Sequence, residues 1–450
     1  MKKRAFLKTS GLLLAGNSFL PMVSCSGGKH QVSRENWAGN LVYSASGLER
    51  PGGVSEVRKV LSKQNHLRVL GTRHSFNTIA DTPHRQISLD AMDDLIEISA
   101  ADRTVSVNGS TQYGVLASTL HEAGFALHNL ASLPHISVAG ACATGTHGSG
   151  DKNGNLPSVV VGMDLITANG DVVQVSEERD GDRFHGMVVH LGALGVVHRV
   201  TLKIEPTFDV CQFVYEDLPL HSLSDHFEEI FSSGYSVSLF TDWQGHRINQ
   251  LWLKMRIHGM QIPRVAEDFY GATLAQNHLH PIREISPVNC TEQMGLPGPW
   301  HLRLPHFKME FTPSSGAELQ SEYFVPRERA VEAIHALYEM GAEIYPHLLI
   351  SEVRSIAADQ LWMSPSYGRD SIALHFTWKP DWASVQKLLP KIESRLKPFG
   401  VRPHWGKLFT LQASDLEAQY ERIGDFRDLI REYDPKGKFK NDFIANHLSI

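Results

Sequence analysis

Two segments in the second half of the chain carry polar residues in pairs that are two positions apart. In "LLISEVRSIA" the pair is Glu352 and Arg354, and in "SIALHFTWKP" it is His375 and Thr377. Because successive side chains of a strand point to opposite faces, residues two apart share one face. If the two strands are neighbours, that face presents a carboxylate, a guanidinium, an imidazole and a hydroxyl, which suits a polyol. The alternative is a solvated cross-strand ion pair, which contributes little.

A histidine also follows a glycine turn in the first half. The stretch "VLGTRHSFN" places His74 shortly after a strand-like apolar run and Gly71. A neutral imidazole can act as a nucleophile, and a glycine lets a ligand approach the backbone closely. One histidine among 24 carries little information by itself, so the alternative is a loop histidine that makes an ordinary hydrogen bond.

A second loop is rich in small residues. In "SLPHISVAGACATGTHGSG", residues 132–150, backbone N–H groups could approach phosphate oxygens, and serine and threonine hydroxyls could add donors. A dinucleotide pyrophosphate would suit such a loop. The sequence has no G-x-G-x-x-G between a strand and a helix and no P-loop motif, so neither of those phosphate sites is predicted. The alternative is a long irregular connection, which is uncommon without a function.

The elements around these loops are predicted from apolar spacing. Residues 53–71 suit a helix capped by Ser55, with Val57, Val60 and Leu61 inward, followed by a strand that ends at Gly71. Together with the hairpins that follow, this order predicts a mixed α+β domain.

Two hairpins and a helix complete that domain. Residues 95–109 alternate around a turn, and residues 110–124 read as a helix closed by a glycine. In residues 164–176 the pair Asn169 and Gly170 tolerates positive φ, which predicts a hairpin with a type I′ turn.

Composition limits the class of protein. The chain has 450 residues, 42% of them hydrophobic, and a net charge of −6, which is typical of a soluble enzyme with two or three domains. This charge offers no broad positive field for nucleic acid. Apart from Cys25, the cysteines are Cys142, Cys211 and Cys290, which are odd in number and far apart. Neither a disulfide framework nor a metal site is expected.

The first residues, 1–29, read as an export signal. A basic start precedes a weakly apolar run that is too short to span a bilayer. "KRAFLK" resembles a twin-arginine signal with Lys3 in place of the usual first arginine, which leaves the export route open. "MVSC" resembles a bacterial lipobox, so lipidation of Cys25 would anchor an exported protein at the periplasmic side of the cell envelope. The alternative is a tolerated cysteine in a leader peptide.

Several longer motifs carry a family resemblance. "RVLGTRHSFN", "SLPHISVAGACATGTHGSG" and "LGALGVVHRVTL" resemble the FAD-binding domain of the vanillyl-alcohol-oxidase (PCMH) type. "NCTEQMGLPGPW", "SPSYGRD", "VRPHWGKLFT" and "DPKGKFKN" extend the resemblance to alditol oxidases and the related aldonolactone oxidases. The resemblance implies an α+β fold with a two-part FAD-binding domain at 35–207, an α+β substrate or cap domain at 208–420, and a C-terminal segment at 421–450 that returns to the FAD domain.

The resemblance also implies the cofactor contacts. His74 would bond covalently to the 8α-methyl carbon of FAD. The other implied FAD contacts are Val69, Leu70, Gly71, Thr72, Arg73, Ser75, Ser132, Ser137, Gly140, Thr144, Gly145, Thr146, His147 and Val197. The loop pattern does not fix the role of His147, which could instead only satisfy backbone groups.

The same resemblance implies a substrate pocket on the polar sheet face. Its substrate-binding residues would be Ser132, Glu352, Arg354, Thr377 and Lys407, and its catalytic residues Lys407, Arg354, Glu352 and His375. Lys407 would assist proton removal or stabilise negative charge on the reduced ring. Arg354 would hold a terminal hydroxyl with Glu352 or stabilise alkoxide character, and the sequence leaves this division open.

Three functions follow as hypotheses. The first is oxidation of a primary alcohol of a xylitol- or sorbitol-like alditol to the aldose, with hydride transfer to FAD and with O2 or another electron acceptor, giving H2O2 in the case of O2. The second is an aldonolactone oxidase or dehydrogenase that acts on a sugar lactone. The third, from another class, is a non-catalytic carbohydrate-binding lipoprotein.

Overall fold

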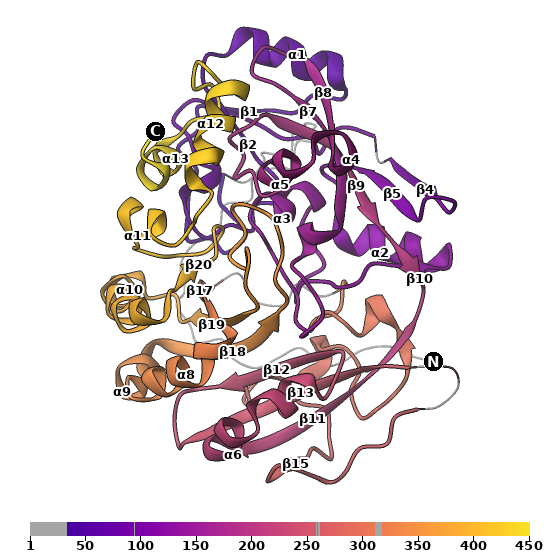
Figure 1. The fold of residues 1–450 in the computed structure, drawn as a ribbon, viewed down its shortest axis with the longest axis vertical. Coiled ribbons are helices and arrows are strands. Elements are labelled where there is room, and N and C mark those ends of the chain that lie inside the picture. The colour runs from indigo at the N-terminus through magenta and orange to yellow at the C-terminus, as the bar shows by residue number, and fades with distance from the viewer. Residues whose placement is uncertain (1–33, 94, 258, 260–261, 311–316) are drawn as a thin grey trace, which may run out of the picture. The chain divides into compact units, whose positions relative to one another are not determined.

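The computed structural model describes residues 34–450 except 94, 258, 260–261 and 311–316 (Figure 1). The predicted export signal and Cys25 fall on residues 1–33, outside this range. The chain separates into two compact units, residues 1–34 and Glu35–Ile450. Within the described ranges, no helix is long and apolar enough to cross a membrane.

Two sheets form the N-terminal part of the second unit. The first has the order β4-β5-β9-β7-β8 and is antiparallel where β4 meets β5 and where β7 meets β8, which confirms both predicted hairpins. The second, β1-β3-β2, is parallel. The bounds are β1 Gly47–Glu49, β2 Leu67–Val69, β3 Arg85–Ile87, β4 Ile96–Ser99, β5 Thr104–Asn108, β7 Val160–Ile166, β8 Val172–Ser176 and β9 Val196–Lys203.

The turn between β7 and β8 differs from the prediction. Only Gly170 has a positive φ, +86°, whereas a type I′ turn needs two such residues. The backbone N–H of Thr167 donates to the carbonyl of Asp171 at 2.9 Å, so the loop between the paired residues is longer than two. The hairpin prediction was right and the predicted turn type was wrong.

The helices of this part also match, apart from one cap. Helix α1 (Val54–Lys63) begins after Gly53, and Ser55 lies exposed inside its first turn, so the predicted serine cap was wrong. Glu56 instead accepts a hydrogen bond from the N–H of Gly52 at 2.8 Å, which satisfies a donor at the helix start. The predicted helix at 110–124 is α2 (Tyr113–Glu122).

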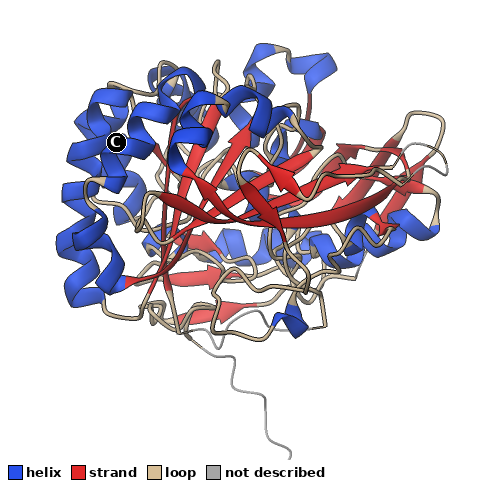
Figure 2. Cartoon of the chain, turned by 90° about the horizontal axis from the view of Figure 1, so that it is seen from below, coloured by secondary structure: helices blue, strands red, loops and turns tan. Residues whose placement is uncertain are grey.

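Most of the second half belongs to one large sheet. Among the described residues, ten strands form it, in the order β14-β15-β11-β13-β12-β18-β19-β17-β20, with β16 paired to β11 (Figures 1 and 2). The bounds are β11 Asp209–Pro219, β12 Ser236–Thr241, β13 Arg247–Arg256, β14 Asp268–Phe269, β15 Ala272–Leu274, β16 Gly298–Pro299, β17 Leu319–Pro326, β18 Leu348–Ile356, β19 Ser371–Trp378 and β20 Arg402–Pro403.

Strands β18 and β19 are antiparallel neighbours, as the polar-face hypothesis required. The opposite face of β19 carries Leu374, Phe376 and Trp378, which are fully buried in one core with residues of α10 (Trp382–Leu396). Figure 1 shows α8 (Ala330–Tyr338) and α10 beside this part of the sheet. Apolar packing on one face therefore leaves the other face to the polar side chains.

The remaining helices belong to both halves of the chain and to its C-terminal segment, and Figure 2 draws all helices in blue. They are α3 Val138–Ala143, α4 Glu177–Asp180, α5 Asp182–Val188, α6 Leu220–Asp225, α7 Phe227–Ser232, α9 Gly341–Ile344, α11 Ala413–Glu417, α12 Ile423–Tyr433 and α13 Asp442–Leu448. A short pair, β6 (Phe125–Ala126) with β10 (Glu205–Pro206), completes the strands.

A buried arginine joins the C-terminal segment to the N-terminal half. The Arg68 guanidinium on β2 donates to the carbonyls of Ile79 (2.5 Å), Leu191 (2.8 Å), Gly192 (2.9 Å) and Phe439 (2.7 Å). Four backbone oxygens from three separate segments therefore share one cation. The domain boundaries at 207 and 420 stay predictions, because residues 35–450 pack as one unit.

We expect Arg68→Met to lower the free energy of unfolding of the holoprotein by about 3 kcal/mol, because the buried carbonyls lose their donor. Denaturant unfolding followed by circular dichroism measures the change. The control is Arg58→Met on the exposed surface of α1, which should change stability by less than about 0.5 kcal/mol. Equal stabilities of the two variants would contradict the role given to Arg68.

Candidate active site

Three polar residues lie in one row across three neighbouring strands of the large sheet, β18, β19 and β17. In the strand register, His375 on β19 stands opposite Glu322 on β17 and opposite Glu352 on β18. Arg354 and Thr377 lie two residues along their strands and share this face. The structure therefore brings together the four residues that alternation placed on one face, and it adds Glu322, which the sequence analysis did not predict.

Glu322 is the centre of an ion-pair cluster. Its side chain is buried, with 1% of the residue exposed. Lys407 Nζ lies 2.6 Å from its Oε2, and Arg354 Nη2 lies 2.7 Å from its Oε1. Lys407 reaches the cluster from the loop that follows β20. Two cations thus compensate one buried carboxylate, as a buried charge requires.

The cluster extends on both sides. Lys407 Nζ lies 2.8 Å from Nδ1 of His375, whose Nε2 lies 3.0 Å from the hydroxyl of Thr377. Arg354 Nη1 donates to the hydroxyl of Ser132 at 3.3 Å. Four of the five predicted substrate-binding residues, Ser132, Arg354, Lys407 and Thr377, are therefore linked through Glu322 and His375. The fifth, Glu352, pairs with Arg354, and its Oε1 lies 3.5 Å from Nε of Arg354.

The charges follow from burial and pairing. Burial raises the pKa of Glu322, but the charges of Lys407, His147 and Arg354 outweigh it and hold this pKa well below its usual value. The pKa of Glu352 is likewise lowered, because Arg354 and His306 outweigh burial. Both carboxylates are therefore ionised at neutral pH.

The pKa values of the two basic groups beside them are also lowered, in this case by burial. Burial, together with the charge of Lys407, lowers the pKa of His375 to about 4, so its imidazole is neutral. Burial also lowers the pKa of Lys407, while Glu322 partly offsets this effect. A lysine with a lowered pKa is closer to serving as a proton acceptor than an exposed one.

Two more residues missed by the sequence analysis join this face. Lys254 on β13 and His306 lie behind Glu352, and His306 Nε2 is 2.7 Å from its Oε1. The available signal was the alternation in "INQLWLKMR", where Gln250, Trp252 and Lys254 share one face of a buried strand. His306 lies in an irregular segment, which gives no periodic signal.

The loop after β2 has the features of a phosphate cradle. Arg73 adopts a left-handed φ of +66°. In the described part of the chain, the backbone N–H groups of Gly71, Thr72, His74 and Ser75 make no hydrogen bond to protein atoms. A bound pyrophosphate requires unpaired backbone N–H groups that its oxygens can approach closely.

The second predicted loop packs against the first. The N–H of Ser137 donates to the hydroxyl of Thr72 at 3.1 Å. A Cβ added at Gly71 would lie 2.9 Å from Ser137 Oγ, and one added at Gly140 would lie 2.7 Å from it. A side chain at Gly71 would therefore crowd Ser137 of the second loop, and one at Gly140 would crowd the same hydroxyl from within that loop. The residues present therefore fit a dinucleotide such as FAD.

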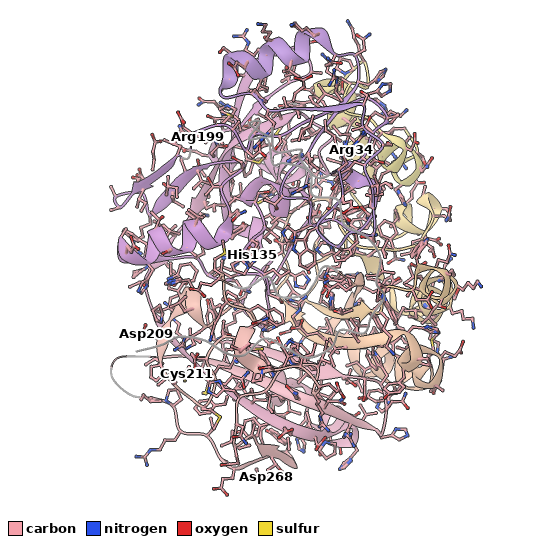
Figure 3. The ribbon with its side chains drawn as sticks, turned by 180° about the vertical axis from the view of Figure 1, so that it is seen from behind. Arg34, His135, Arg199, Asp209, Cys211 and Asp268 are labelled. Atoms are coloured by element: carbon pink, nitrogen blue, oxygen red, sulfur yellow. The ribbon has the colours of Figure 1, made fainter. Side chains whose placement is uncertain are left out.

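His74 itself is half-buried and neutral. Burial, with smaller effects of His135 and Arg73, lowers its pKa to about 4. Its ring stacks on Trp37 with centroids 5.1 Å apart. His135, labelled near the middle of Figure 3, bonds the carbonyl of Met309 at 2.9 Å. An uncharged imidazole in this place is a competent nucleophile.

The loop that carries His74 is joined to the loop that carries Lys407. The N–H of Phe76 donates to the carbonyl of Gly406 at 2.8 Å. The amide of Asn77 donates to the carbonyls of Trp405 (2.8 Å) and Lys407 (2.7 Å). The predicted cofactor loop and the predicted catalytic lysine therefore have a fixed relation.

The other predicted cofactor residues lie around these loops. Val69 ends β2, Leu70 and Ser75 belong to the first loop, and Val197 on β9 borders Gly109 beside α3. Thr144, Gly145 and Thr146 follow α3, and the Thr144 hydroxyl is 3.1 Å from that of Thr146.

Each ring nitrogen of His147 has a close polar neighbour. Its Nδ1 lies 2.8 Å from the carbonyl of Gly148, as the backbone alternative expected. Its Nε2 lies 3.2 Å from Oε1 of Glu322, but without the alignment of a hydrogen bond. His147 therefore borders the ion-pair cluster and contacts more than backbone.

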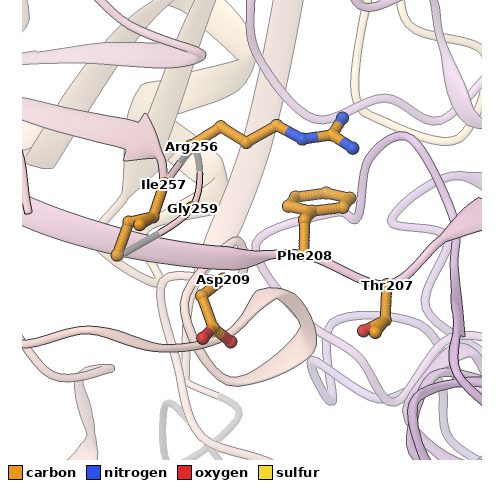
Figure 4. Close-up of a pocket in the computed structure, with 6 residues that line it drawn as sticks. All are labelled: Thr207, Phe208, Asp209, Arg256, Ile257 and Gly259. Atoms are coloured by element: carbon orange, nitrogen blue, oxygen red, sulfur yellow. The ribbon is translucent and has the colours of Figure 1, made fainter. Parts of the chain in front are cut away.

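A surface hollow of about 390 Å³ lies apart from this cluster (Figure 4). The Arg256 guanidinium covers the Phe208 ring at 3.8 Å and pairs with Glu205 at 3.0 Å. The hollow is lined by Thr207, Phe208, Asp209, Arg256, Ile257 and Gly259. Because its cation is already paired and no predicted site residue lines it, the buried cluster remains the candidate active site.

Comparisons with known proteins agree with this geometry. The profile of the FAD binding domain family matches residues 46–176, and that of D-arabinono-1,4-lactone oxidase matches residues 316–447. An alditol oxidase from a Streptomyces species is 47% identical over 417 residues, which cover 92% of this chain and 98% of the relative. L-gulonolactone oxidase from Mus musculus is 27% identical and covers 92% of this chain and 97% of the relative.

Among solved structures, cholesterol oxidase from Brevibacterium sterolicum has a TM-score of 0.72 at 14% identity and covers 92% of this chain and 96% of its own. This likeness concerns the fold alone. Together with the match to the FAD binding domain family, it confirms the α+β, vanillyl-alcohol-oxidase-type fold expected from the sequence. The family matches confirm the resemblance read from the motifs. The chain belongs to the alditol oxidase family of FAD-dependent oxidoreductases that act on CH–OH groups.

Proposed function

We propose that this enzyme oxidises a primary alcohol group of an alditol to the aldose, with O2 as the acceptor that regenerates FAD and yields H2O2. The observation that carries the proposal is the row of Glu322, His375 and Glu352 with Arg354 and Lys407, which presents both donors and acceptors on one rigid sheet face. The 47% identity to an alditol oxidase supports the same substrate class.

FAD would be held by the two loops that pack together at Thr72 and Ser137, and covalently through His74. The unpaired N–H groups of the first loop would receive the pyrophosphate. Bound FAD would supply the hydride acceptor for the alcohol carbon. Neutral His74 has the nucleophilic lone pair that attachment requires.

The polyol would be oriented by the polar face. The carboxylate of Glu352 accepts hydroxyl protons in hydrogen bonds, whereas Arg354 and the hydroxyls of Ser132 and Thr377 donate. Lys407 lies between Glu322 and His375, and its lowered pKa suits it to assist removal of the hydroxyl proton. His375 holds the side chains of Lys407 and Thr377 in place through its two ring nitrogens.

Oxidation of a sugar lactone is the second candidate function. The profile match to D-arabinono-1,4-lactone oxidase over residues 316–447 and the 27% identity to an L-gulonolactone oxidase favour it. The higher identity to an alditol oxidase places the polyol first. A non-catalytic sugar-binding protein has no support in these relatives.

We predict that the purified enzyme releases H2O2 with xylitol and sorbitol, and does so faster than with L-gulono-1,4-lactone. A coupled peroxidase assay measures the rates, and anaerobic bleaching of the yellow enzyme shows flavin reduction separately. Peroxide from the lactone alone would contradict the alditol proposal. Anaerobic bleaching by polyols without aerobic peroxide would instead contradict O2 as the acceptor.

The role of Lys407 is tested with Lys407→Met, which nearly keeps the length of the side chain and removes the amine. We expect its kcat with xylitol to fall about 100-fold, which is typical of the loss of an acid–base group. Its absorption spectrum should stay that of the bound flavin. An unchanged kcat would remove Lys407 from the chemistry.

For the covalent link, we expect the wild-type band on a denaturing gel to fluoresce under ultraviolet light, and the His74→Ala band to be dark. The reason is that a covalent flavin survives unfolding and a dissociable one does not. His135→Ala, which changes a neighbouring histidine, should keep the fluorescent band. Complete release of flavin from the wild-type protein on denaturation would exclude the link.

We also propose export and lipid anchoring through Cys25, on the lipobox-like "MVSC" of the sequence. In fractionated cells, the wild-type protein should stay with membranes after a high-salt wash, because an acyl anchor resists salt. Cys25→Ser should abolish the anchor. Release of the wild-type protein by salt alone would argue against lipidation.

A further inference from the structure

A buried lysine lies on the polar sheet face, two strands away from the strand that carries Glu352. Lys254 on β13 is 1% exposed. Its Nζ lies within hydrogen-bond distance of three acceptors, the carbonyls of Leu304 (2.5 Å) and Pro305 (3.1 Å) and Nδ1 of His306 (3.2 Å). An ammonium group has three N–H donors and no acceptor. The three partners therefore match its protonated form completely.

This arrangement assigns the proton of His306. Because Lys254 donates to Nδ1, the ring hydrogen belongs on Nε2, which lies 2.7 Å from Oε1 of Glu352. Burial lowers the pKa of His306 to about 4, so the ring carries only that one proton. Trp252 and Phe240 meet the ring edge-on at 5.2 and 5.5 Å and fix its plane.

The consequence for Glu352 is one occupied and one available oxygen. Oε1 accepts from His306 and lies 3.5 Å from Nε of Arg354. In the described part of the chain, Oε2 has no hydrogen-bond partner. A carboxylate held in this way offers a single oriented acceptor to a substrate hydroxyl.

His306 is also tied to the other predicted substrate contacts. Its backbone N–H donates to the carbonyl of Ser132 at 3.3 Å, and the Ser132 hydroxyl accepts from Arg354. A shift of His306 would therefore move Ser132 and Glu352 together.

We propose that Lys254 and His306 are positioning residues for Glu352, and that they determine the affinity for the polyol rather than the rate of hydride transfer. This inference rests on the proposed function. Neither residue contacts the reacting atoms in this arrangement, because Glu352 lies between them and the substrate position. They act by holding one carboxylate oxygen and its neighbours in place.

The pair adds a dependence on pH. Burial lowers the pKa of Lys254 to about 7, with Glu352 and Cys290 raising it and Arg354 lowering it; these groups and His306 are the ionisable neighbours that face it. Above this pKa the Lys254 amine is neutral and can accept a hydrogen bond from Nδ1 of His306. The single ring proton of His306 can then move from Nε2 to Nδ1, and Nε2 no longer donates to Glu352. The KM for xylitol should therefore rise with pH through the neutral range.

The test compares His306→Gln with His306→Asn in the holoenzyme. A glutamine amide can place an N–H where Nε2 lies, whereas an asparagine amide is one methylene too short to reach Glu352. We expect Asn to raise the KM for xylitol by at least about tenfold, the worth of a hydrogen bond to a charged group, with kcat within about threefold of wild type. Gln should restore a KM within about threefold of wild type.

Lys254→Met supplies an independent variant, and its KM should lose the rise with pH. Equal KM values for the Gln and Asn variants, or a fall in kcat with KM unchanged, would overturn the proposal. If the Asn variant does not fold as a yellow protein, the pH profile of Lys254→Met against wild type decides. If only a lactone reduces the wild-type flavin, the polyol function fails, and the same variants are then compared with the lactone.

Discussion

The need to neutralise one buried carboxylate governs the polar face of the large sheet. Glu322 is 1% exposed, and its two oxygens lie 2.6 and 2.7 Å from Lys407 and Arg354. Because Arg354 also pairs with Glu352, the two cations balance two buried carboxylates, and removing either cation would leave one negative charge without a counter-charge. Because Glu322, Arg354 and Lys407 come from β17, β18 and the loop after β20, this charge balance draws three segments to one point.

The division between strands and loops then makes chemical sense. Glu322, Glu352, Arg354, His375 and Thr377 sit on paired strands, where register fixes them, whereas Lys407 and the groups that would cradle a large cofactor sit on loops. Asn77 connects the two by bonding the carbonyls of Trp405 and Lys407. The acid–base residue and the cofactor loop are thereby held as one assembly.

Local patterns predicted what depends on local geometry. The alternation around Glu352 and Arg354 has a period of two, so the shared face followed from the sequence, as did the helix within 110–124. Glu322 and Lys254 were missed because only the pairing of strands distant in sequence shows that they join this face. The role of His74 came from resemblance to a family. The type I′ turn failed because the loop between Thr167 and Asp171 is longer than two residues. The Ser55 cap failed because α1 already begins at Val54, which places Ser55 inside the helix.

The guanidinium of Arg68 has a consequence for how the chain can be divided. One of its four carbonyl partners, Phe439, lies 371 residues further along the chain, whereas Arg68 directly precedes the loop of His74. The support of the cofactor loop therefore includes a segment beyond residue 420. For this reason, the first half is not a module that could be detached and transplanted.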